Sequence, residues 1–113
     1  MSQQNCIFCQ IIAGELKSTI VWQNDLSIVI RDMFPQAPCH LLIIPKKHFT
    51  DITECKDPLL LGNIFNQVSQ LATQEGLSSG FRLVINTGTD GGQSVSHLHI
   101  HLLGGREMQW PPG

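Results

Sequence analysis

Three histidines alternate with aliphatic residues near the end of the chain, in the segment His97-Leu98-His99-Ile100-His101-Leu102. Side chains of a β-strand point to opposite faces in turn, so this period of two predicts a strand with imidazoles on one face and aliphatic side chains on the core face. Neighbouring rings on such a face would lie roughly 6.6–6.8 Å apart along the strand. All three rings could therefore serve one group of the size of a phosphate.

Three kinds of chemistry fit such a row of rings. A neutral imidazole can attack phosphorus and form a covalent intermediate, while neighbouring histidines, partly protonated, hold the phosphate oxygens. Alternatively, three imidazole ligands and a water molecule make a catalytic zinc centre, which would give a metal-dependent hydrolase. In the third interpretation the histidines bind an anion without turnover, and the chain is a binding module.

The turn Gly91-Gly92-Gln93-Ser94 before the histidines favours phosphate over metal. Its glycines let the backbone approach a ligand, and successive backbone N–H groups with a serine hydroxyl make a concave anion site. Asp90 is the nearest acidic residue that could support a metal ligand from behind. The middle ring, His99, has a ring on either side that could orient it and stabilise charge, so we expect His99 to be the nucleophile.

Four cysteines stand at positions 6, 9, 39 and 55. The pair Cys6-Ile7-Phe8-Cys9 has the spacing of a metal half-site, of a redox pair or of two ordinary helical cysteines. No second such pair completes a zinc ribbon, so a structural zinc would need His48 and His97 as its other ligands, brought in by the fold. We expect catalysis itself to require no cofactor.

The elements that position these residues follow from hydrophobic periodicity and turn signals. Apolar residues at helical spacing predict a short helix over 6–14 and a longer one over 58–75. Strands are predicted over 19–22, 26–32, 40–45 and 81–86 and along the histidine segment. Strands and helices do not alternate regularly, which indicates an α+β domain on an antiparallel sheet. The broad apolar face of the 58–75 helix predicts a partner subunit.

Length and composition set the class of protein. The 113 residues suit a single domain over 1–113, and 42% hydrophobic with 14% charged residues predicts a globular chain. A net charge of -2 gives no electrostatic reason to expect nucleic acid as a partner. No apolar run approaches the ~20 residues that span a bilayer. The polar start Met1-Ser2-Gln3-Gln4-Asn5 lacks the features of a signal peptide, so a cytoplasmic protein is expected.

The segment His97–Leu103 resembles the His-φ-His-φ-His-φ-φ signature of the histidine triad (HIT) superfamily, where φ is an apolar residue. Other motifs, spread over nearly the whole chain, resemble the HINT branch of that superfamily. They are Cys6-Ile7-Phe8-Cys9, Pro35-Gln36-Ala37-Pro38, His40, Ile44-Pro45-Lys46-Lys47-His48, Asp90-Gly91-Gly92-Gln93-Ser94-Val95, Leu103-Gly104-Gly105-Arg106 and Trp110-Pro111-Pro112-Gly113.

The resemblance implies a HIT-like five-stranded antiparallel sheet with two helices, in a homodimeric purine nucleoside phosphoramidase. Such an enzyme cleaves the P–N bond of AMP linked to an amine, through a nucleotidyl-histidine intermediate on His99 that water hydrolyses. His97 and His101 would orient His99 and contact phosphate, and His40 would join the proton network. Ser94 would assist the leaving amine.

The resemblance also implies which residues bind the nucleotide. Asp32 would hold the ribose hydroxyls, and Met33 would lie against the purine base. Trp110 would reach the site of the partner subunit and shape its leaving-group side. Further contacts to the nucleotide would come from Asn86, Gly92, Ser94, Val95, His99 and His101.

Overall fold

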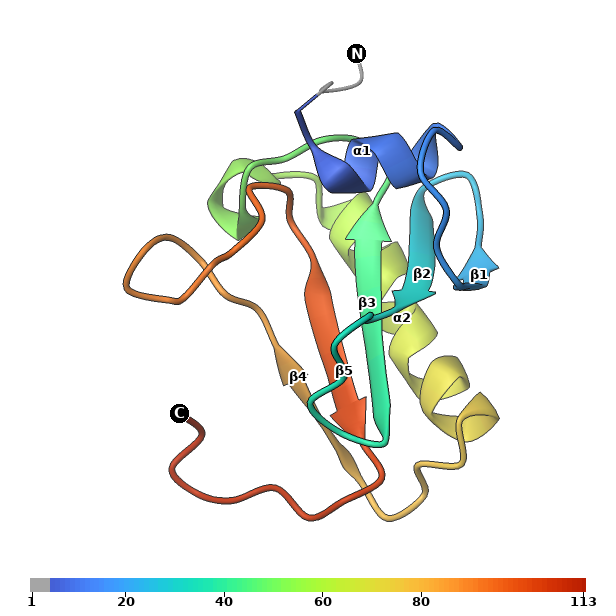
Figure 1. Ribbon diagram of the computed structural model, residues 1–113, viewed down its shortest axis with the longest axis vertical. Helices are drawn as coiled ribbons and strands as arrows, with labels where there is room; N and C mark the ends of the chain where they lie inside the picture. The colour runs from blue at the N-terminus through green and yellow to red at the C-terminus, as the bar shows by residue number, and fades with distance from the viewer. Residues whose placement is uncertain (1–4) are drawn as a thin grey trace.

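In the computed structural model, residues 5–113 are described, and they form a five-stranded antiparallel sheet with a helix on each face (Figure 1). The strand order is β1-β2-β3-β5-β4, so β3 lies in the middle of the sheet. The elements are α1 (Ile7–Ile12), β1 (Ile20–Gln23), β2 (Ser27–Arg31), β3 (Cys39–Pro45), a 3-10 turn (Ile52–Glu54), α2 (Pro58–Gln74), β4 (Phe81–Val84) and β5 (Ile100–Gly104).

Both predicted helices and all five predicted strands are present, with ends shifted by one or two residues except at the histidine segment. Residues 1–4, on which the expectation of no signal peptide partly rests, lie outside the described residues. Neither helix of the described chain is long and apolar enough to cross a membrane.

The histidine segment differs from its prediction, because β5 begins only at Ile100. Continuing the β3–β5 register beyond Ile43 and Ile100 would bring Leu98 opposite Pro45. A proline has no N–H to give to a ladder. The carbonyl of Pro45 instead binds the ring of His97, and the N–H of Leu98 donates to Phe49 O at 2.7 Å. His97 and His99 therefore lie outside the regular strand.

Helix α2 covers one face of the sheet with its own apolar side. Asp57 caps the helix by accepting hydrogen bonds from the N–H groups of Leu59 and Leu60, and Pro58 occupies the first turn. The buried side of the helix includes Val68, which packs in a core with the aliphatic residues of β3 and β5. The apolar face that was expected to bind a partner is thus largely used within the chain.

The shorter helix α1 covers only part of the opposite face (Figure 1). Phe8 and Ile11 of this helix pack on alternate residues of β2 and β3, such as Ile30 and Leu42. Residues paired across antiparallel strands share a face. Leu42 pairs with His101, and His40 pairs with Leu103, so both histidines lie on the face that carries α1. Six helical residues are too few to cover this face, and the part beyond α1 forms the floor of a site.

Candidate active site

The expected nucleophile, His99, is buried beneath α1. Its exposed fraction is 5%, and the ring of Phe8 meets it edge-on at a centroid distance of 5.0 Å. Nδ1 of His99 lies 2.7 Å from the carbonyl oxygen of His97. A carbonyl can only accept, so Nδ1 carries a hydrogen and donates. Burial lowers the pKa of His99, which keeps the ring neutral and leaves the lone pair on Nε2.

A second chain of hydrogen bonds fixes His40 and His101. The backbone N–H of Gln36 donates to Nδ1 of His40 at 3.0 Å. Since Nδ1 accepts, the hydrogen of a neutral His40 is on Nε2, which lies 2.9 Å from Nδ1 of His101 and donates to it. In a neutral His101 the remaining hydrogen is therefore on Nε2. His101 thus offers an N–H donor, with its ring 5.0 Å from that of His99 between centroids.

Burial, more than neighbouring charge, sets the protonation of these rings. It lowers the pKa of His101 to about 4, with smaller contributions in the same direction from His99 and His40. It also lowers the pKa of His40, although the carboxylate of Asp32, 3.6 Å from His40 Nε2, acts in the opposite direction. The expectation of partly protonated neighbours is wrong at neutral pH, because desolvation exceeds the effect of Asp32. The rings act as neutral donors and acceptors.

His97 faces a different part of the molecule. Its ring is completely buried, and Nε2 donates to the carbonyl oxygen of Pro45 at 2.8 Å. Nδ1 then carries the lone pair and lies 3.2 Å from Sγ of Cys6 and 3.6 Å from Sγ of Cys9. The expectation that its ring contacts phosphate is therefore wrong, since both nitrogens are occupied elsewhere. His97 orients His99 through its backbone carbonyl.

The cysteine–histidine cluster, formed by Cys6, Cys9, His48 and His97, brings the predicted metal ligands together. The four donor atoms lie within 4.8 Å of one another, and Cys9 Sγ is 3.3 Å from His48 Nδ1. Around a tetrahedral zinc, Zn–S and Zn–N bonds of about 2.3 and 2.0–2.1 Å place sulfur and nitrogen about 3.5 Å apart. The separations between sulfur and nitrogen here are 3.2–3.6 Å. Nδ1 of His97 carries a lone pair and lies next to both sulfurs, so the four residues fit a zinc ion.

A second group, Asp32, His40 and His101, also has its donor atoms within 4.8 Å. Its tautomers do not suit a metal, because Gln36 N–H holds the hydrogen of His40 on Nε2, the nitrogen that would have to bind the ion. The three rings of the triad do not converge on one point either, since His97 Nδ1 faces the cysteines. The geometry thus does not support the hypothesis of a catalytic zinc held by the triad.

The Gly-rich turn is held in shape by two amide side chains. Asn86 Nδ2 donates to Gly91 O at 2.7 Å. Gln93 Nε2 donates to the carbonyls of Thr50 and Val95 at 2.7 and 3.0 Å. A Cβ at Gly91 would collide with the backbone of Thr87, so this position requires glycine. The bracing function of Gln93 was missed, because a glutamine in a turn gives no sign of which carbonyls it will reach.

The other residues expected to contact the nucleotide differ in their exposure. Gly92 in the turn has a positive φ of 74°, and Ser94, two residues later, is exposed. Val95 packs against the core on the α1 side. Met33 and Trp110 have exposed fractions of 81% and 83%, so neither closes the site within one chain.

We expect the free energy of unfolding to decrease as the pH falls from 6.5 to about 4. The unfolded chain binds protons on its histidines below pH 6.5, whereas folded His101 stays neutral down to its pKa of about 4. In that window the unfolded state holds more protons, so acid favours unfolding. Denaturant titrations at pH 7, 5.5 and 4.5 measure the slope, which should be shallower in His101→Gln. Equal slopes in the two proteins would contradict the prediction.

Comparisons with known proteins show what this chain is similar to. A family model described as HIT domain matches residues 13–108. The chain is 49% identical over 112 residues to an uncharacterized HIT-like protein of Synechococcus elongatus, covering 97% of this chain and 98% of that one. It is 44% identical over 116 residues to a protein of Arabidopsis thaliana named adenylylsulfatase HINT1, covering 99% of this chain and 79% of that one.

The fold is also similar to that of solved structures. A HIT family hydrolase from Legionella pneumophila superposes with a TM-score of 0.93 at 51% identity, covering 96% of this chain and 100% of that one. A histidine triad protein from Clostridium difficile gives a TM-score of 0.91 at 38% identity, covering 96% and 97%. The expected antiparallel fold with five strands and two helices is confirmed.

Proposed function

The chain belongs to the HIT domain family, and from this premise we propose that it hydrolyses the P–N bond of purine nucleoside 5′-phosphoramidates. One observation supports the proposal above all others. His99 is held neutral with its lone pair on Nε2, next to an N–H donor on His101. This pairing of a nucleophile with a donor suits attack on a phosphoryl group.

In the first step, Nε2 of His99 attacks the α-phosphorus of an AMP–amine substrate. An N–P bond to His99 forms, the P–N bond to the amine breaks, and the electron pair leaves with the amine nitrogen. Ser94 donates a hydrogen bond to this nitrogen, which takes up a proton from solvent as it departs. The N–H group of His101 stabilises the negative charge on the phosphate oxygens in the transition state.

In the second step, water attacks phosphorus and loses a proton to solvent as a P–O bond forms. The N–P bond breaks, and its electron pair returns to Nε2 of His99. AMP is released, and His99 returns to its neutral form with the hydrogen on Nδ1, where the carbonyl of His97 holds it. The chain from Gln36 through His40 to His101 keeps one tautomer throughout the cycle. Fixed donors of this kind need no rearrangement when charge develops.

The nucleotide is held around the floor of the sheet. We propose that the half-buried carboxylate of Asp32 binds the ribose hydroxyls, and that Met33 covers the base. The backbone of the Gly-rich turn at Gly92, Ser94 and Val95 binds the phosphate. Asn86 contributes through the turn that it braces.

Replacing the nucleophile tests the proposal. His99→Ala should lower the hydrolysis rate of adenosine 5′-phosphoramidate roughly 10³-fold or more, because the covalent route is lost. AMP binding, measured by calorimetry, should change little. Added imidazole should restore part of the rate in His99→Gly. Substantial phosphoramidase activity in His99→Ala would overturn the assignment, and wild-type protein that binds AMP without turnover would indicate a binding module.

The same assay should include the mixed anhydride of AMP and sulfate as a second substrate. The Arabidopsis relative is named an adenylylsulfatase. In both substrates the α-phosphorus of AMP is bonded to the leaving group, which is an amine in one and sulfate in the other. The same attack by His99 on this phosphorus would therefore release either group. Faster release of AMP from the anhydride than from the phosphoramidate would make sulfate, rather than an amine, the preferred leaving group.

We also propose that the cysteine–histidine cluster holds a structural zinc ion. Cys6 and Cys9 would bind it through sulfur, and His48 and His97 through Nδ1. The ion would stabilise the fold and tie α1 to the sheet, without contact with the substrate. The four cysteines, all among the described residues, form no disulfide, which suits a reducing, cytoplasmic compartment.

Metal analysis of the purified protein tests this site. Wild-type protein should contain about one zinc per chain, and the double variant Cys6→Ser/Cys9→Ser should contain none, because thiolates supply half of the ligands. A chelator should lower the melting temperature of the wild type. The control is Cys55→Ala, which removes a buried thiol in the α2-side core and should keep the metal. A folded, metal-free wild type would contradict the proposal.

We further propose that the protein is a homodimer joined along β4. This strand is an edge of the sheet, with free backbone groups that can pair with a second copy. Phe81 at its start is 40% exposed. The C-terminal tail lies on the β4 side of the sheet (Figure 1), so pairing there would bring this tail, which contains Trp110, toward the partner.

Sedimentation should then give twice the chain mass of 12.5 kDa at micromolar concentration. Phe81→Glu should shift the equilibrium to monomers, because it places a charge at the interface. Leu59→Glu is the matched control, since Leu59 is an exposed apolar residue on α2. Dissociation by Leu59→Glu but not by Phe81→Glu would move the interface to α2.

A further inference from the structure

The peptide groups of Gln36 connect the histidine relay to the segment after β5. Its N–H donates to His40 Nδ1 at 3.0 Å. Its carbonyl oxygen accepts two hydrogen bonds from the guanidinium of Arg106, from Nη2 at 3.0 Å and from Nε at 3.3 Å. Arg106 thus lies two hydrogen bonds away from a ring of the active site, without being part of that site.

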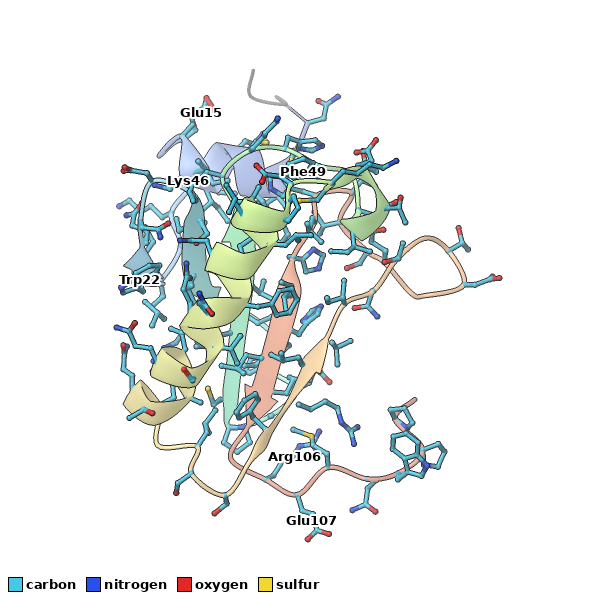
Figure 2. All side chains as sticks on the ribbon, turned by 180° about the vertical axis from the view of Figure 1, so that it is seen from behind. Glu15, Trp22, Lys46, Phe49, Arg106 and Glu107 are labelled. Atoms are coloured by element: carbon cyan, nitrogen blue, oxygen red, sulfur yellow. The ribbon has the colours of Figure 1, made fainter. Side chains whose placement is uncertain are left out.

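The chain is built to let these two segments meet. Gly105 has a positive φ of 90°, and a Cβ there would lie 2.9 Å from the side chain of Pro38. Glycine at this position therefore allows the segment after β5 to approach the loop between β2 and β3. Within that loop, Gln36 Nε2 donates to Phe34 O at 2.9 Å, which stiffens it. Figure 2 shows Arg106 near the end of the sheet that is farthest from α1.

The charge of Arg106 is directed at the backbone. Among residues 5–113, no carboxylate forms an ion pair with Arg106, whereas Arg31 pairs with Glu75 at 2.8 Å. Nη1 of Arg106 binds a further carbonyl, that of Glu107, at 3.2 Å. Hydrogen bonds from a cation are stronger than neutral ones. The guanidinium therefore fixes the loop at Gln36, and with it the position of the N–H that donates to His40.

We propose that Arg106 is a positioning residue for the hydrolysis, acting through Gln36 on the tautomers of His40 and His101. The inference rests on the proposed function and extends it to a residue that does not contact the substrate. Arg106 holds the Gln36 loop, the N–H of Gln36 keeps the hydrogen of His40 on Nε2, and His40 keeps the hydrogen of His101 on the nitrogen that faces phosphate. Without Arg106, the loop relaxes and both rings sample the other tautomer.

The kinetic test is Arg106→Ala, assayed on adenosine 5′-phosphoramidate. We expect kcat to fall roughly tenfold with KM nearly unchanged, because the donor on His101 matters most in the transition state. Arg106→Lys should keep the fold and recover only part of kcat, since an ammonium cannot bracket the carbonyl with two fixed N–H groups. Arg106→Lys also tests the proposal if Arg106→Ala does not fold.

Arg82→Ala is the matched control. Arg82 is the other arginine that holds the C-terminal tail, by donating to Gln109 O at 2.7 Å, and it does not contact Gln36. Its loss should leave the tautomers of His40 and His101 as they are in the wild type. A mixture of tautomers in Arg82→Ala as large as in Arg106→Ala would overturn the proposal, because general placement of the tail would then explain both.

Nitrogen NMR of the histidine rings tests the proposal without turnover. In wild-type protein, His40 and His101 should each show the single tautomer with hydrogen on Nε2, and Arg106→Ala should show a mixture of tautomers at both rings. Unchanged tautomers in Arg106→Ala, or an unchanged kcat, would overturn the proposal. Wild-type protein without phosphoramidase activity would refute the proposed function, while the NMR comparison would still decide whether Arg106 positions the rings.

Discussion

The buried ring of His97 is the constraint on which the site depends. A buried imidazole must have partners for both nitrogens, or its desolvation is not compensated. Pro45 provides a carbonyl for Nε2, which leaves Nδ1 to face the cysteines. The backbone carbonyl of the same residue then accepts from His99. His97 therefore fixes the tautomer of His99 and is one member of the cysteine–histidine cluster, so a shift of His97 would disturb both.

The unequal lengths of the two helices explain why the site lies where it does. Helix α2 is long enough to cover its face of the sheet, whereas α1 leaves part of the other face open. At this boundary the rings are buried enough to stay neutral but close enough to the surface to meet a substrate. The protein thus controls its histidines by tautomer rather than by charge. Backbone groups of His97 and Gln36 do this at both ends of the histidine row.

The sequence was sufficient to predict the faces of the histidine row but not its regularity. Leu98, Ile100 and Leu102 lie in the α2-side core, as their alternation indicates. The strand nevertheless starts late, because the interruption comes from Pro45, a residue of a different strand that only the pairing register brings opposite. Hydrophobic periodicity is a property of a single segment, whereas the late start of β5 depends on how β5 pairs with β3.

The residue types of the cysteine–histidine cluster could be recognised in the sequence, whereas the backbone groups that bind the active-site rings could not. The spacing of Cys6 and Cys9 was visible in the sequence, and the fold supplied His48 and His97. The functions of Gln36 and of the His97 carbonyl could not be predicted, because every residue has a peptide group and none is marked by its side chain. The apolar face of the 58–75 segment was predicted correctly, but an amphipathic pattern does not say whether its partner is the same chain.

The cysteine–histidine cluster also joins distant parts of the chain, since Cys6 meets His97 across 91 positions. The floor beneath α1 is made of β2 and β3, and its centre by residues near position 99. During synthesis, the first helix therefore has no complete surface to dock on until most of the chain has left the ribosome. Contacts between residues so far apart in the sequence form late in folding, because closing the long loop between them costs conformational entropy. A nascent or truncated chain that ends before His97 lacks both the cysteine–histidine cluster and His99, so the cluster and the proposed site form only after residues 97–101 have been added.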